Sequence, residues 1–122
     1  MIVLVMSLAG GLGAVARFAL DGLVVARAGR RFPYGTLLIN ISGSLLLGVL
    51  TGLTLAHGAP TALRTVAGTG FCGGYTTFST ASFETVRLLQ ERRWAAALAN
   101  GAGTLVLTLL AAALGLWVTG AL

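Results

Sequence analysis

The sequence predicts an all-α integral membrane protein with four transmembrane helices, the third of them interrupted. Of its 122 residues, 57% are hydrophobic and 9% are charged, and the mean hydropathy is +0.94. A membrane-spanning helix needs about 20 apolar residues, so the chain has room for four such helices and little else. We therefore expect one membrane domain, residues 1–122, with helices near 2–26, 35–56, 61–89 and 95–118 and a break near 73–77.

The charged residues agree with this class. The eight basic residues are all arginines, the net charge is +5, and the isoelectric point is about 11.2. In a soluble protein such values would indicate nucleic-acid binding. Here most arginines lie in short connections between apolar runs, where they act as topology signals, so we expect the lipid bilayer and no nucleic acid as partner.

The first apolar run contains a Gly-x-Gly pattern at residues 11–16. It lacks the acidic residue and the βαβ alternation of a dinucleotide site, whereas Gly10 and Ala14 suit close helix packing in lipid. Arg17 and Asp21 lie one turn apart and can pair. Because a charge within a span costs about 2.5–3.5 kcal/mol at its centre, Arg17 either reaches the membrane interface or lines an aqueous vestibule.

The second run follows a basic, aromatic loop that ends in Phe32, Pro33 and Tyr34. One helix face then carries small and polar residues at every fourth position: Thr36, Asn40, Ser44, Gly48 and Gly52. This stripe has two interpretations. It either packs against a neighbouring helix or places the Asn40 amide in a pore.

The third run is broken by residues 68–80, which are rich in glycine and hydroxyl groups. In a membrane, backbone that leaves the helix must be satisfied by protein, water or an ion, and broken helices tend to line ion sites. Freed carbonyls suit a small cation such as Na⁺. An anion could instead be met by the positive ring edge of Phe78 and by the hydroxyls of Thr77, Ser79 and Thr80.

The fourth run is an Ala/Leu helix with a second polar stripe, at Asn100, Thr104 and Thr108. Packing of small residues and a polar lining are both compatible with it. Elsewhere the titratable residues are sparse: the carboxylates are Asp21, Glu84 and Glu91, with one histidine and one cysteine. They offer no acid–base pair, metal cluster or triad, so we expect neither an enzyme nor an organic cofactor.

Three motifs in order along the chain resemble the CrcB/Fluc family of fluoride channels. They are Gly-Gly-Leu-Gly-Ala-Val-Ala-Arg at 10–17, Tyr-Gly-Thr-Leu-Leu-Ile-Asn at 34–40, and Gly-Phe-Cys-Gly-Gly-Tyr-Thr-Thr-Phe-Ser-Thr at 70–80. The resemblance implies an antiparallel, dual-topology dimer of four-helix subunits, two fluoride pores and a structural Na⁺ on the two-fold axis.

The same resemblance implies roles for individual residues. Gly73 and Thr76 would offer backbone carbonyls to Na⁺, and Asn40 would line the fluoride pore. Phe78 would be the first ring of the family's aromatic box. Further positions correspond to the family's polar track (Asn100, Thr104 and Thr108) and to polar sites near the pore vestibules (Arg17 and Glu84).

One position departs from the family pattern. The second box phenylalanine usually follows the first by three residues, and here that position is Ala81. Phe83 lies roughly 140° around the helix from Phe78, at about 100° per residue, and does not replace the missing ring. A two-ring box in each pore would then need a ring from another chain.

The arginines are distributed unequally between the two ends of the predicted bundle. Arg64 stands alone on one side, and the other side carries Arg27, Arg30, Arg31, Arg92 and Arg93. The positive-inside rule therefore predicts that the first and third loops are cytoplasmic. This bias leaves two arrangements open: an antiparallel homodimer, or a heterodimer with a paralogous subunit of opposite orientation.

Two other functions remain as alternatives at this point. A small proton-coupled multidrug exporter also has four helices in a chain of this length. Such exporters resemble one another in an acidic residue buried in the first span, whereas Asp21 lies near the end of its run. A membrane scaffold would leave the glycine-rich break and both polar stripes without a purpose. A plasma-membrane fluoride channel is the leading interpretation.

Overall fold

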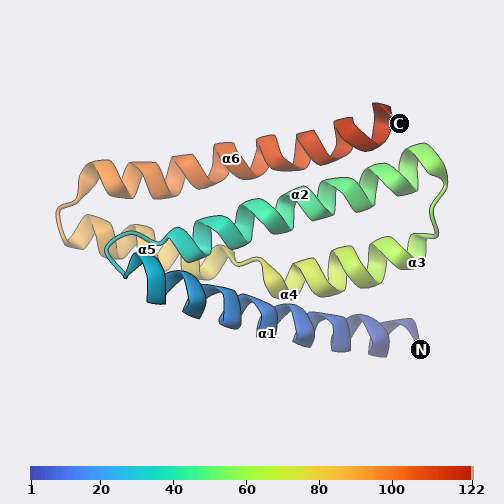
Figure 1. The fold of residues 1–122 in the computed structure, drawn as a ribbon, viewed down its shortest axis with the longest axis horizontal. Helices are drawn as coiled ribbons and strands as arrows, with labels where there is room; N and C mark the ends of the chain where they lie inside the picture. Colours follow the sequence, from blue (N-terminus) through green and yellow to red (C-terminus); the bar gives the residue numbers. More distant parts are fainter. Residues whose placement is uncertain (122) are drawn as a thin grey trace.

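The computed structural model describes residues 1–121, and within them all regular structure is helical (Figure 1). The helices, in order, are α1 (Ile2–Ala28), α2 (Tyr34–His57), α3 (Thr61–Leu63), the π-helix η1 (Arg64–Cys72), α4 (Gly73–Tyr75), α5 (Phe78–Gln90) and α6 (Trp94–Ala121). From α3 to α5 the chain follows one path, which makes this the interrupted third of four helices. Each of the four begins and ends within one turn of the expected position.

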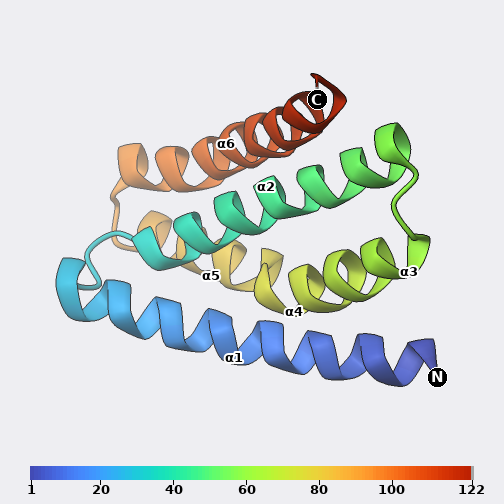
Figure 2. The same cartoon turned by 45° about the vertical axis from the view of Figure 1, so that its right-hand side comes forward.

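The four helices lie side by side as an elongated bundle (Figures 1 and 2). Both termini and the α2–α3 connection lie at one end, and the α1–α2 and α5–α6 connections lie at the other. By length and composition, α1, α2 and α6 are apolar enough to cross a membrane. The interrupted helix runs beside them, so its break lies at mid-depth of the bundle.

The helix ends follow from local sequence. Pro33 precedes α2 and Pro60 precedes α3, positions where a missing N–H costs no helical hydrogen bond. Gly29 ends α1 and Gly58 ends α2, with φ of 72° and 64°. Glycine adopts such left-handed conformations without the steric penalty that a Cβ would bring.

Close helix contacts depend on glycine at two seams. Between α1 and the third helix, a Cβ on Gly13 would lie 2.1 Å from the Phe71 carbonyl oxygen, and a Cβ on Gly74 would lie 2.0 Å from the Gly10 carbonyl oxygen. Between α2 and α6, a Cβ on Gly48 would lie 2.2 Å from the Ala112 carbonyl oxygen. Gly10 is therefore a packing position, as the sequence indicated, and Gly13 is a second one.

The break is shorter than the sequence predicted. The glycines of residues 68–74 remain helical, first in η1 and then in α4, and only Thr76 and Thr77 leave the helix. The expectation that the whole glycine-rich stretch is broken was wrong. Two of its glycines, Gly70 and Gly74, pack against α1, where they leave room for the backbone of Met6 and Gly10. The π-helix was not predicted.

Candidate functional site

Two extended residues form the break. Thr76 has φ −76° and ψ 161°, and Thr77 has φ −150° and ψ 121°. The Thr77 hydroxyl oxygen accepts a hydrogen bond from the Thr80 N–H at 3.1 Å and so caps the N-terminus of α5. This cap restarts the helix immediately after the break.

Asn40 on α2 holds the break in place. Its Nδ2 donates to the Thr77 carbonyl at 2.9 Å, and its Oδ1 accepts from the Thr77 N–H at 2.8 Å. The amide therefore satisfies both backbone polar groups of Thr77. It has one further N–H, and Asn40 lines the large groove described below. Asn40 thus bonds a neighbouring helix, as the packing interpretation predicts, and its place in a pore stays a prediction.

Arg17 lies on the opposite side of the same break. Its Nη1 donates to the Thr76 carbonyl at 3.3 Å. The pair suggested with Asp21 is not among the salt bridges of residues 1–121. The Asp21 carboxylate lies instead against the first turn of α2, where a Cβ on Gly35 would be 2.1 Å from Asp21 Oδ1. The positive end of the helix dipole favours an anion there.

A groove of about 630 Å³ collects most of the predicted site residues. α2 contributes Asn40, α4 and the break contribute Gly73 and Thr76, and α5 contributes Phe78. From α6 the lining includes the whole predicted stripe: Asn100, Thr104 and Thr108. Arg64, at one end, is the sole charged residue in this lining.

The aromatic residues near the groove do not cover it. Phe78 is 88% exposed and lies at the groove margin, and Ala81 contributes only a methyl group. Phe83 is 69% exposed and does not line the groove. Among residues 1–121, no second ring lines the groove.

The α6 stripe is only partly free to meet a ligand. Asn100 is fully buried, and its Nδ2 donates to the Ala81 carbonyl at 3.2 Å and to Thr85 Oγ1 at 2.9 Å. Thr108 donates to the Leu105 carbonyl. The Thr104 hydroxyl has no hydrogen-bond partner within residues 1–121. Asn100 thus joins α6 to α5, and the Thr104 hydroxyl oxygen is buried without a partner among the described residues.

A smaller cavity of about 370 Å³ lies between α1, α2 and α5. Arg17, Asp21, Thr36 and Thr80 line it. Ser79 and Glu84 line neither cavity. Arg17 and Thr36 therefore share a polar recess, as the vestibule interpretation requires, while Thr80 lies apart from Asn40 and Thr104 in the groove.

Sequence reasoning missed the structural importance of Thr77 and Thr85. Thr77 caps α5 and pairs with Asn40, and Thr85 accepts the Asn100 amide. The Thr77-x-x-Thr80 spacing just before an apolar helix is an N-cap signal that could have identified the first. Thr85 gives no such local signal, because its partner lies on another helix.

The oxygens at the break fit the donor chemistry of a hard cation. Residues 1–121 contain no cluster of three His, Cys, Asp or Glu side chains that could hold a metal ion. The Thr77 N–H, which would bond the Gly73 carbonyl in a continuous helix, instead binds Asn40. The Gly73 and Thr76 carbonyls are thus candidate ligands for Na⁺, but hard cations need more oxygens than two.

Proteins of known family with similar sequences support the resemblance that the three sequence motifs suggested. A family model described as "CrcB-like protein, Camphor Resistance (CrcB)" matches residues 4–116. The chain is 56% identical over 120 residues to "Fluoride-specific ion channel FluC 1" of Leifsonia xyli, covering 98% of this chain and 88% of that protein. It is 51% identical over 111 residues to "Fluoride-specific ion channel FluC 2" of Mycobacterium tuberculosis, covering 91% and 85%.

A third relative extends the match beyond these two bacteria. "Fluoride-specific ion channel FluC" of Syntrophotalea carbinolica is 47% identical over 109 residues, covering 88% of this chain and 89% of that protein. The resemblance drawn from the three motifs is thereby confirmed, and the exporter and scaffold alternatives are set aside. The chain belongs to the CrcB/FluC family, a family of fluoride ion channels and not of enzymes.

Proposed function

We propose that this protein is a passive, fluoride-selective channel of the cell membrane that lowers cytoplasmic fluoride. The observation that carries the proposal is the groove, whose lining is neutral apart from Arg64. Transferring a carboxylate-sized ion to low dielectric costs on the order of 20 kcal/mol by the Born estimate. Neutral donors offset part of this cost and still release the ion, as conduction requires.

The predicted pore residues have different roles in this proposal. Asn40 and Thr104 line the groove and would provide hydrogen-bond donors to the anion, and Phe78 would meet it with its ring edge. Asn100 and Thr108 support the α6 wall, and Ser79 and Thr80 add hydroxyls at the start of α5. Arg17 and Thr36 would form a polar vestibule in the smaller cavity, which Asp21 also lines, and Glu84 lies outside it on α5.

A second subunit completes the pore. An ion in a groove open to lipid would lose its hydration without replacement, so a cover is required. An antiparallel copy of the chain would provide it, and a paralogous subunit would do so equally well. Because Ala81 and Phe83 supply no second ring, a heterodimer partner could bring one. The homodimer is the simpler arrangement and is our first choice.

The same dimer would complete a structural Na⁺ site. Two copies meeting at their breaks would double the carbonyl set to the Gly73 and Thr76 oxygens of both chains. A cation there would neutralise the negative ends of the half-helices and hold the copies together. Arg17 is already bound to the Thr76 carbonyl, so it would share that oxygen with the cation.

The arginine distribution sets the proposed orientation. In the folded chain Arg27, Arg30, Arg31, Arg92 and Arg93 gather at the α1–α2 and α5–α6 end, opposite both termini (Figure 1). We therefore place that end in the cytoplasm for the favoured orientation. In a homodimer one copy would have to insert against this bias.

Fluoride efflux from liposomes tests the function. We expect the purified chain alone to form a dimer and to release fluoride far faster than chloride, as read by ion-selective electrodes. A monomer that releases fluoride only after a paralogous subunit is added would favour the heterodimer. A stable dimer without fluoride flux would refute the channel itself.

Removal of sodium tests the cation site. We expect replacement of Na⁺ by N-methylglucamine on both sides of the membrane to lower fluoride flux at least about tenfold. Without the cation, the Gly73 and Thr76 carbonyls of the two subunits would repel one another across the interface. Size-exclusion chromatography should show dissociation, and restored Na⁺ should reverse both effects. Flux and assembly that persist through exhaustive Na⁺ depletion would contradict the site.

A further inference from the structure

One end of the bundle carries the whole net charge of the protein. Six arginines and Glu91 lie at that end, and we call the arginines the basic platform: Arg27, Arg30, Arg31, Arg87, Arg92 and Arg93. Elsewhere Arg17 and Arg64 balance Asp21 and Glu84 in number, so the net +5 resides on the platform. Such a concentration attracts anions to this end of the molecule.

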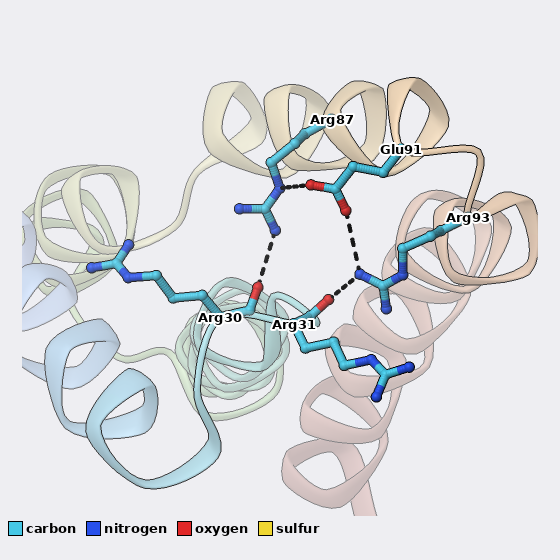
Figure 3. A network of polar contacts seen from close by, with 5 residues as sticks. All are labelled: Arg30, Arg31, Arg87, Glu91 and Arg93. Atoms are coloured by element: carbon cyan, nitrogen blue, oxygen red, sulfur yellow. Dashed lines mark hydrogen bonds and ion pairs between the residues drawn. The ribbon is translucent and has the colours of Figure 1, made fainter.

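Two platform arginines bind backbone carbonyls of the α1–α2 loop (Figure 3). Arg87 Nη2 donates to the Arg30 carbonyl at 3.3 Å, and Arg93 Nη1 donates to the Arg31 carbonyl. Glu91 lies between them, 3.8 Å from Arg87 Nε and 3.5 Å from Arg93 Nη1. The network joins the α1–α2 loop to the α5–α6 loop.

The remaining guanidinium groups are exposed. Figure 3 shows the Arg30 and Arg31 side chains pointing away from the network that binds their carbonyls. Within residues 1–121 no hydrogen bond or ion pair is found for the guanidiniums of Arg27, Arg30, Arg31 and Arg92. Arg92 also has φ 57°, a left-handed conformation usually given to glycine.

Aromatic residues place the platform at the membrane surface. The Phe32 and Tyr34 rings lie 4.8 Å apart beside the platform, and Trp94 begins α6 with 67% of its surface exposed. Tyrosine and tryptophan concentrate at the level of lipid headgroups. The exposed guanidiniums therefore lie at the depth of lipid phosphates, with which arginine forms paired hydrogen bonds.

We propose that the basic platform binds the phosphate groups of anionic phospholipids. Arg30, Arg31 and Arg92 make the direct contacts, Arg27 adds charge at the end of α1, and Arg87 and Arg93 fix the two loops in position. Phosphatidylglycerol represents the class, since its phosphate charge is not offset by a cationic headgroup. This binding is independent of fluoride conduction.

Native mass spectrometry with titrated lipid tests the proposal. We expect the wild-type protein to bind phosphatidylglycerol in preference to phosphatidylcholine. Each arginine near the surface changes affinity about fivefold, so the triple variant Arg30→Gln, Arg31→Gln, Arg92→Gln should lose about 100-fold. The matched control is Arg64→Gln at the other end, which should retain wild-type affinity. Equal affinity in wild type and triple variant, or equal loss in the control, would overturn the proposal.

Two further measurements probe the charge of the bound group and its source. Raising the salt concentration about tenfold should weaken phosphatidylglycerol binding to the wild type, since exposed charges are screened, and salt-insensitive binding would overturn the proposal without any variant. Inorganic phosphate should not displace the lipid at equal concentration. Full displacement would identify the platform as a free-phosphate site and refute the lipid assignment.

Discussion

Replacement of Asn40 by aspartate is expected to abolish fluoride flux. The carboxylate would place a negative charge in the groove wall and could not donate to the Thr77 carbonyl, which Asn40 Nδ2 now binds at 2.9 Å. Two like charges 4 Å apart repel by about 4 kcal/mol at an effective dielectric constant of ~20. This corresponds to a loss of about 1000-fold in rate, measurable by fluoride efflux from liposomes.

Asn40→Leu is the uncharged control, because it removes the hydrogen bonds to Thr77 without adding a negative charge. It leaves the Thr77 N–H and carbonyl unpaired without adding charge, which should cost about 1–3 kcal/mol of stability for each buried group. The aspartate variant could still accept from the Thr77 N–H, so the two variants share only the loss of the donor to the Thr77 carbonyl. Thermal unfolding in detergent would compare their stabilities. The electrostatic role predicts that the aspartate variant loses more flux than the leucine variant at similar stability. Wild-type flux in a dimeric Asn40→Asp protein would remove Asn40 from the pore.

Gly13→Ala is expected to separate α1 from the third helix. The added Cβ would lie 2.1 Å from the Phe71 carbonyl oxygen and 2.8 Å from the Tyr75 nitrogen, and both are backbone atoms that cannot turn aside. Overpacking of this kind costs about 1–3 kcal/mol, and we expect the upper end or more. The melting temperature should fall by roughly 10 °C. Flux should fall with it, because α1 carries Arg17 to the break.

Gly11→Ala is the matched control on the same helix. A Cβ at Gly11 meets nothing within 4 Å, so alanine there should be neutral or slightly stabilising, by up to about 1 kcal/mol. A similar loss of stability in both variants would point to a general effect of alanine on α1. A stable Gly13→Ala protein would show that the seam relaxes more easily than its geometry indicates.

The membrane class, the four helices and their limits followed from the sequence. Hydropathy and length determine where a helix can cross a bilayer, and Pro33, Gly29 and Gly58 mark ends that depend only on local backbone geometry. The motifs at 10–17, 34–40 and 70–80 also identified the family. All these features reside in neighbouring residues, where periodicity and conformational preference are decisive.

The extent of the break and the pairing of the polar groups were decided by tertiary structure alone. Glycine content predicted a long interruption, but the glycines stay helical, with Gly70 and Gly74 packed on Met6 and Gly10, and the break is confined to Thr76 and Thr77. The Asn40–Thr77 and Asn100–Thr85 bonds join residues far apart in the chain. A buried polar group takes the partner that packing brings to it. The sequence by itself therefore determined which residues are polar inside the membrane, and packing decided which of them remain free to meet an ion.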